Sequence, residues 1–217
     1  LAYDFFGNLN LALISIMLLE GIYFYNYTTP EFNVNVSQLP FWALSALFTW
    51  RCIKYDKKID FVILALFLGL GFLSKYLFIY LIIGIKILFI YLFVNKKKKS
   101  YNFFIIGPVA LIVVSPHLVW LIQNEFISLS YGLQRTGVND NQLNHLIFPL
   151  IFILKQIAIL IPFFLMFLFL IKKIKIRKFI LDSKMIFLLF TFILPIFLII
   201  LTSTIFGVKI RTMWMTP

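Results

Sequence analysis

Cations border strongly apolar segments at several points of the chain, and such cations can bind phosphate. Lys75 follows Ser74 between two apolar segments, and Lys209 and Arg211 follow the last one. A lysine in such a place can hold its ammonium group against an anion while its methylene stem stays in hydrocarbon. Simple snorkelling of Lys75, and an ordinary interfacial role for Lys209 and Arg211, are the competing interpretations. We interpret all three residues as candidate phosphate ligands.

A short polar segment, residues 26–35, contains the carboxylate of Glu31 and three asparagine amides. It is either a simple capped turn, with Thr29 as N-cap and Pro30 in the first turn of a helix, or a functional loop that also caps the helix. Asn35 begins an N-x-[ST] sequon, a pattern that is weak at this length.

A longer polar segment, residues 123–144, offers groups suited to a sugar or a phosphate. We expect an outer loop in which Asn124 and Arg135 bind substrate, because loops of about twenty residues are often functional. Trp214 is the third candidate for substrate binding. His117 precedes the segment, and we interpret it as an interfacial hydrogen-bonding residue, since no second histidine or carboxylate follows four positions later.

Several common catalytic motifs are missing from the sequence. It has no Walker A loop, no H-E-x-x-H, no G-x-S-x-G and no cluster of cysteine and histidine. Cys52 is the only cysteine, so the sequence offers no intrachain disulfide and no thiolate metal cage. The usual sequence evidence for nucleotide hydrolysis and for zinc proteolysis is therefore missing. We assign no metal-binding residues and no certain cofactor, and whether a divalent metal is required stays open.

The composition places most of the chain in lipid. Hydrophobic residues make up 62% of the 217 residues, charged residues make up 13%, and the mean hydropathy is +1.00. A water-soluble domain could not enclose this much apolar surface. The net charge of +12 sits in clusters between apolar runs, which favours a membrane topology signal over nucleic-acid binding. The sequence predicts an all-α polytopic membrane protein with one transmembrane domain over 1–217.

Apolar runs bounded by charges or turn residues predict about seven spans, at 8–26, 38–53, 60–73, 76–94, 102–122, 145–171 and 185–206. Basic clusters at 51–58, 96–99 and 172–184, with four, four and six of the 20 Lys and Arg residues, then fall on one side. That side is cytoplasmic by the positive-inside rule. Residues 60–73 and 76–94 must form a hairpin that turns at Lys75, because a single crossing would separate two of the clusters.

Three charged residues, Glu20, Lys86 and Lys155, fall within predicted spans. An unpaired charge at the centre of a bilayer costs about 2.5 to 3.5 kcal/mol on insertion scales. We therefore expect each of them to pair or to face the interior of the bundle.

Five motifs in this order resemble the bacterial branch of the dolichyl-phosphate-mannose protein mannosyltransferase family, which is glycosyltransferase family 39, with the aminoarabinose transferases of lipid A as relatives. The motifs are Thr29-Pro30-Glu31, Phe41-Trp42-Ala43-Leu44, Gly69-Leu70-Gly71-Phe72-Leu73-Ser74-Lys75-Tyr76, Ser115-Pro116-His117-Leu118-Val119-Trp120 with Asn124, and Lys209-Ile210-Arg211 before Trp214-Met215-Thr216-Pro217. The most specific of them is the break between two helices that contains Lys75.

The resemblance implies a GT-C-type helical bundle that moves a hexose or pentose from a polyprenyl-phosphate donor to a lipid or protein acceptor on the extracytoplasmic side. It implies donor-phosphate binding by Lys75, Lys209 and Arg211. The family's general base would lie upstream of Leu1, so we interpret the sequence as a fragment cut at both ends and inactive alone. Glu31 is the matching carboxylate of the segment 29–31, but one inserted residue and a longer side chain depart from the family pattern.

Other classes of membrane protein share these features. A transporter or flippase of lipid-linked sugars would also need an interfacial lysine, charges within the membrane and a polar outer loop. Transporters often contain paired broken helices in two halves, and only the break at Lys75 is evident here, which favours the transferase. A non-catalytic assembly subunit is a third possibility. We expect the protein in the inner (plasma) membrane of a bacterium, with its active side extracytoplasmic.

Overall fold

The structure, a computed structural model, describes residues 1–26, 29–95, 100–135, 142–171 and 181–211. Every element within these residues is helical. In chain order they are α1 (Ala2–Phe6), α2 (Leu9–Met17), η1 (Leu18–Gly21), α3 (Tyr23–Asn26), α4 (Val34–Tyr55), α5 (Lys58–Ser74), η2 (Tyr76–Phe78), α6 (Ile79–Val94), η3 (Asn102–Ile105), α7 (Ile106–Gln123), α8 (Ile127–Arg135), α9 (Asn144–Ile159), α10 (Ile161–Ile171), α11 (Ser183–Leu188), η4 (Leu189–Ile193) and α12 (Leu194–Phe206).

Helices occupy all seven segments that the sequence predicts as spans, but fewer of them qualify by length and hydropathy. Within the described ranges, Tyr76–Val94, Asn102–Gln123 and Ser183–Phe206 are long and apolar enough to cross a membrane. The segment predicted as one span at 145–171 is α9 and α10, which are bent by 50° and qualify only as a pair. The structure therefore supports a helical membrane protein with three or four candidate spans, and seven spans stay a prediction.

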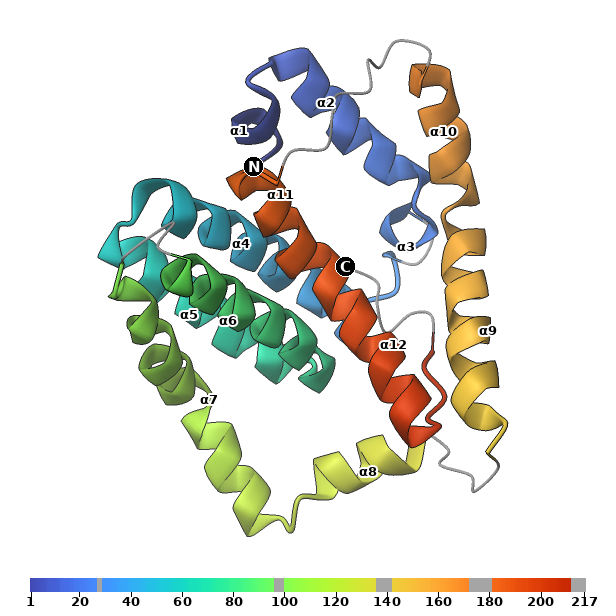
Figure 1. The fold of residues 1–217 in the computed structure, drawn as a ribbon. Helices are drawn as coiled ribbons and strands as arrows, with labels where there is room; N and C mark the ends of the chain where they lie inside the picture. The colour runs from blue at the N-terminus through green and yellow to red at the C-terminus, as the bar shows by residue number, and fades with distance from the viewer. Residues whose placement is uncertain (27–28, 96–99, 136–141, 172–180, 212–217) are drawn as a thin grey trace.

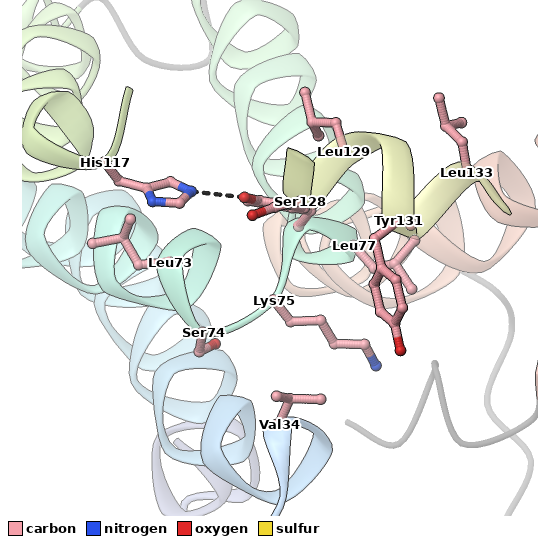
Figure 2. Close-up of a pocket in the computed structure, with 12 residues that line it drawn as sticks. Val34, Leu73, Ser74, Lys75, Leu77, His117, Ser128, Leu129, Tyr131 and Leu133 are labelled. Atoms are coloured by element: carbon pink, nitrogen blue, oxygen red, sulfur yellow. Dashed lines mark hydrogen bonds between the residues drawn. The ribbon is translucent and has the colours of Figure 1, made fainter. Parts of the chain in front are cut away.

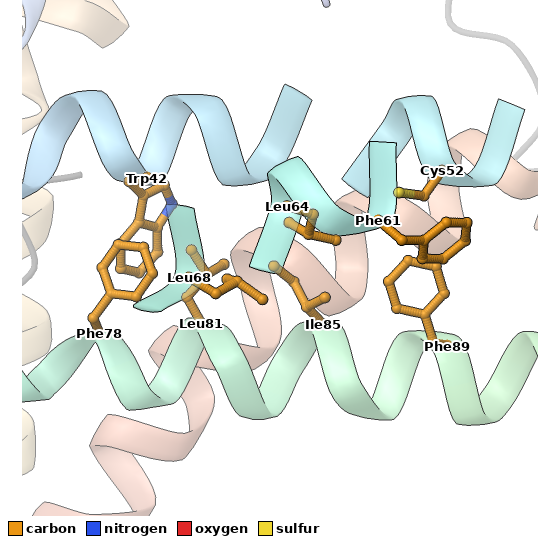
Figure 3. Packing of buried hydrophobic residues seen from close by; sticks show 9 residues of the cluster. All are labelled: Trp42, Cys52, Phe61, Leu64, Leu68, Phe78, Leu81, Ile85 and Phe89. Atoms are coloured by element: carbon orange, nitrogen blue, oxygen red, sulfur yellow. The ribbon is translucent and has the colours of Figure 1, made fainter. Parts of the chain in front are cut away.

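Two groups of helices lie on either side of α11 and α12 (Figure 1). One group contains α4, α5, α6 and α7, and the other contains α2, α3, α9 and α10. The largest set of buried side chains among the described residues joins α4, α5 and α6 (Figure 3), with Trp42 against Phe78 at one end and Phe61 against Phe89 at the other. The core thus lies next to the break that contains Lys75.

The predicted hairpin of α5 and α6 is confirmed. Phe61 near the start of α5 contacts Phe89 near the end of α6, with 5.6 Å between the ring centroids. At the other end, Gly71 of α5 faces Phe78, the last residue of η2, and a Cβ atom at Gly71 would overlap the Phe78 ring. The two helices are therefore antiparallel, with Lys75 at their turn.

The described cations of the first and third basic clusters lie at the end of the bundle away from Lys75. Lys54 Nζ lies 2.6 Å from Asp4 Oδ1, and Lys184 Nζ donates to the carbonyl oxygen of Phe5, so one member of each of these clusters reaches α1. The second cluster, 96–99, lies outside the described residues. In the sequence this cluster follows α6. Because α5 and α6 are antiparallel, the end of α6 lies at the same end of the bundle as the start of α5.

The three charged residues within predicted spans neither form described ion pairs nor face the interior of the bundle, contrary to the expectation from the sequence. Glu20, Lys86 and Lys155 are exposed on the surface of the bundle and have no ion pair among the described residues. The buried face of α6 runs through Leu81 and Leu88, and Lys86 projects from a different face. For this part of the chain, the expectation of pairing or of an interior position is wrong.

Candidate functional site

The helix break after α5 places Lys75 at the turn of the hairpin. α5 ends at Ser74, whose Oγ donates a hydrogen bond to the carbonyl oxygen of Gly71 at 2.6 Å. Lys75 then adopts an extended backbone, with φ −165° and ψ 127°, before η2 begins at Tyr76. Because Gly71 has no side chain, Phe78 can fold back against α5, and the chain reverses within a few residues.

The ammonium group of Lys75 is mostly buried and contacts the first turn of α4. Its Nζ donates a hydrogen bond to Oδ1 of Asn35 over 2.6 Å. Burial lowers the pKa of Lys75 to about 7, because removal from water penalises the charged form. The amide of Asn35 is neutral, so this contact places no negative charge beside the ammonium.

Asn35 is held in place by the start of α4. Oδ1 of Asn33 accepts hydrogen bonds from the backbone N–H groups of Asn35, at 2.9 Å, and Val36, at 3.3 Å, so Asn33 is the N-cap. The interpretation of Thr29 as N-cap is therefore wrong. Thr29 Oγ1 instead donates to the carbonyl oxygen of Tyr25 at 3.0 Å.

A pocket of about 530 Å³ opens beside Lys75, between the hairpin, α7 and α8 (Figure 2). Its size suits a small-molecule ligand, since such sites measure roughly 300 to 1,000 Å³. Its described walls contain hydroxyls and imidazole besides the lysine, but no carboxylate. They are Val34, Leu73, Ser74, Lys75, Tyr76, Leu77, His117, Ser128, Leu129, Tyr131, Gly132 and Leu133. Among these described residues, the pocket combines mostly apolar walls with the cation of Lys75.

α8 supplies one wall of this pocket, and it lies in the segment predicted to be a long loop. Residues 127–135 are helical, so the expectation of a loop throughout 123–144 is wrong. The chain turns into α8 at Glu125 and Phe126, both of which have positive φ. In Figure 2, the side chain of Lys75 extends toward the side of the pocket where Tyr131 of α8 lies.

A hydrogen-bonded pair, Tyr76 and His117, forms a second polar part of the pocket wall. The Tyr76 hydroxyl oxygen lies 2.7 Å from Nε2 of His117. The His117 ring also stacks on Trp120, with 5.6 Å between centroids and 15° between planes. These contacts agree with the interpretation of His117 as a hydrogen-bonding residue, and they tie α7 to the break.

Of the other predicted site residues, those that the structure describes are not among the pocket walls. Lys209 and Arg211 are exposed after α12, and Glu31 is exposed in the bend before α4. Asn124 ends α7, and its Nδ2 donates to the carbonyl oxygen of Trp120 at 2.8 Å. Arg135 ends α8, with a side chain outside the described part, and Trp214 falls outside the described residues.

Sequence reasoning missed three polar pocket contributors, Asn35, Tyr76 and Ser128. Asn35 is 40 positions from Lys75, and its only visible signal was a sequon. Tyr76 stood in the motif, but its partner is 41 positions away. Ser128 was read as part of a loop. A local sequence pattern does not indicate which residues far apart in the chain will contact one another.

The helical fold, with its candidate membrane spans, and the pocket lined by apolar side chains and Lys75 are features of a membrane protein with a candidate small-molecule site. A model of the dolichyl-phosphate-mannose-protein mannosyltransferase family matches residues 1–120, which is more than half of the chain. The protein belongs to this family, whose members are membrane glycosyltransferases with the GT-C fold. No curated protein and no solved structure matches the chain significantly.

Proposed function

We propose that this protein transfers a sugar from a polyprenyl-phosphate donor to a lipid or protein acceptor on the extracytoplasmic side of a bacterial inner membrane. The observation that carries the proposal is the buried ammonium of Lys75, beside a pocket with apolar walls. A phosphodiester with a polyprenyl chain needs both features, since its phosphate is anionic and its chain is hydrocarbon. Membership of the mannosyltransferase family supports the reaction class.

The reaction follows from the chemistry of the donor. A hydroxyl or amine of the acceptor attacks the anomeric carbon, the bond from that carbon to the phosphate oxygen breaks, and polyprenyl phosphate leaves. The phosphate gains negative charge as this bond breaks, and the Lys75 ammonium stabilises that charge more strongly in the transition state than in the ground state. A carboxylate must take the proton of the acceptor. Glu31 is the candidate within this sequence, and the family resemblance places the general base upstream.

Orientation in the membrane supports the extracytoplasmic side. The described basic residues Lys54 and Lys184 lie at the end of the bundle away from Lys75, and by the positive-inside rule we expect that end to be cytoplasmic. Lys209 and Arg211 enter the proposal as a second cationic segment for the donor. Asn124, Arg135 and Trp214 enter it as substrate-binding residues. No bound metal ion is part of the proposal.

A transfer assay tests the proposal. The full-length protein in liposomes is given polyprenyl-phosphate mannose with a radiolabelled sugar, and label is measured in lipid and protein acceptors. We expect transfer by the wild type, its loss in Lys75→Ala, and wild-type transfer in Lys58→Ala, which removes an exposed lysine at the opposite end of α5. Glu31→Gln tests the carboxylate. Movement of the lipid-linked sugar across the bilayer without transfer would replace the transferase by a flippase.

A further inference from the structure

The hydroxyl–imidazole pair of Tyr76 and His117 lies on the pocket wall apart from the Lys75 ammonium. Lys75 has an extended backbone, and side chains of successive residues in an extended chain point in opposite directions. The Lys75 ammonium accordingly contacts Asn35 of α4, whereas the Tyr76 hydroxyl contacts His117 of α7. In Figure 2, the Lys75 side chain extends away from His117. One pocket thus has a cation and, at a distance from it, a second polar group on its walls.

Aromatic contacts hold the pair in place. The Tyr76 ring lies against Phe72 of α5, with 5.4 Å between centroids, and against the His117 ring, with 5.7 Å. The His117 ring also stacks on Trp120. Because each of the two side chains contacts two other rings, the hydroxyl oxygen and Nε2 have defined positions at the pocket. A ligand that binds them therefore loses little affinity to the ordering of side chains.

We propose that Tyr76 and His117 form the sugar-binding part of the donor site, where they exchange hydrogen bonds with hydroxyl groups of the sugar while Lys75 contacts the phosphate. This inference rests on the proposed function, and it names the residues that distinguish the glycosylated donor from the bare lipid phosphate. The sugar contact and the phosphate contact come from different side chains, so they can be removed separately.

The hydrogen-bonding capacity of the pair suits a sugar hydroxyl in either tautomer of His117. If Nε2 is the acceptor, the Tyr76 hydroxyl donates its proton to the imidazole and keeps lone pairs that can accept from a ligand. If Nε2 carries the proton, the Tyr76 hydroxyl accepts it as a hydrogen bond and can donate its own proton to a ligand. A sugar hydroxyl both donates and accepts, so it meets both cases. A phosphodiester has only acceptor oxygens and meets one.

The same hydrogen bond also joins α7 to the helix break, so a test must separate sugar binding from helix packing. Tyr80 provides a matched control. It lies four residues further on, in α6, and its hydroxyl donates to Thr202 Oγ1 of α12 at 3.0 Å. It is not among the described walls of the pocket. Tyr80→Phe therefore removes a tyrosine hydrogen bond between helices without changing those walls.

Equilibrium binding of two probes to the detergent-solubilised full chain tests the inference. The probes are tritiated polyprenyl-phosphate mannose and tritiated polyprenyl phosphate, which share the lipid and a phosphate and differ in the sugar. The variants are Tyr76→Phe, His117→Phe, Tyr80→Phe and Lys75→Ala, and the affinity of each is divided by that of the wild type for the same probe. A role in helix packing alone would lower both ratios equally.

The expected losses differ between the two probes. Tyr76→Phe and His117→Phe should each weaken binding of the sugar-bearing probe by about threefold to tenfold, the effect of one lost hydrogen bond, and should leave binding of polyprenyl phosphate unchanged. Tyr80→Phe should leave the affinity for both probes at the wild-type value. Lys75→Ala should weaken the binding of both, since both carry a phosphate.

Two results would overturn the inference in distinguishable ways. If Lys75→Ala weakens both probes, but Tyr76→Phe and His117→Phe weaken the two probes equally or weaken neither, then the pair does not bind the sugar and the proposed function stands. If the wild type binds neither probe, the proposed function itself fails, and the sugar-binding role of the pair fails with it.

Discussion

At the scale of the residue, the environment of Lys75 includes the apolar groups that partly bury it and the neutral amide of Asn35, which accepts a hydrogen bond from it. Its place in a break between helices was predictable from Ser74-Lys75 between apolar runs. The amide partner was not, because it lies 40 positions away and depends on where α4 begins. The fold places this lysine on the wall of a mostly apolar pocket, where it is the proposed ligand of the donor phosphate.

The pH dependence of donor binding follows from this environment. Burial lowers the pKa of Lys75 to about 7, and an anion binds the ammonium form. Affinity for a phosphodiester donor should therefore be constant below about pH 7 and fall as pH rises above it, by at most about tenfold per unit. Equilibrium binding at a series of pH values checks this. Lys75→Arg should bind with no such decline, since a guanidinium stays protonated, and an affinity that rises with pH would refute the assignment.

At the scale of the element, the hairpin depends on glycines that admit close neighbours. Gly69 approaches α7, where a Cβ atom would lie 2.8 Å from Cβ of Val113, and Gly71 faces Phe78. The charge argument predicted the hairpin because two basic clusters had to share a side. It could not predict α8, because a nine-residue helix with polar residues between apolar ones has no run long enough to stand out.

Gly71→Ala should destabilise the protein by about 1 to 3 kcal/mol, because the new methyl group overlaps the Phe78 ring and one of the two must move. The denaturation midpoint of the detergent-solubilised protein measures this effect. Gly107→Ala is the matched control, since nothing lies within 4 Å of a Cβ atom there and alanine favours a helix. Equal midpoints for the two variants would show that the close contact at Gly71 contributes nothing.

At the scale of the whole molecule, the described basic residues Lys54 and Lys184 and the pocket lie at opposite ends of the bundle. Composition predicted the helical membrane class, because that class follows from the summed hydropathy. Charge spacing predicted that the basic clusters share one side, because an even number of predicted spans separates each cluster from the next. The exposed positions of Glu20, Lys86 and Lys155 could not be predicted, because the packed face of an all-apolar helix leaves no periodic signal in the sequence.

Cysteine accessibility tests this orientation. Cys52 is fully buried, so the native cysteine should stay unlabelled in intact cells. An impermeant maleimide applied from outside should label Ser130→Cys on α8 and leave Lys58→Cys at the start of α5 unlabelled until the membrane is permeabilised. Both positions are exposed. Labelling of Lys58→Cys alone in intact cells would invert the topology and place the pocket in the cytoplasm.

The most direct test of the central claim is photo-crosslinking of the full chain in liposomes with polyprenyl-phosphate mannose that carries a diazirine next to the phosphate. Peptide mapping should place the adducts in residues 73–77 and 127–135, the walls of the pocket beside Lys75. Lys75→Ala should lower their yield about tenfold, as expected for loss of one charge-assisted contact, and Lys58→Ala should not. Adducts only elsewhere, with a yield unaffected by Lys75→Ala, would contradict the assignment of this pocket as the donor site.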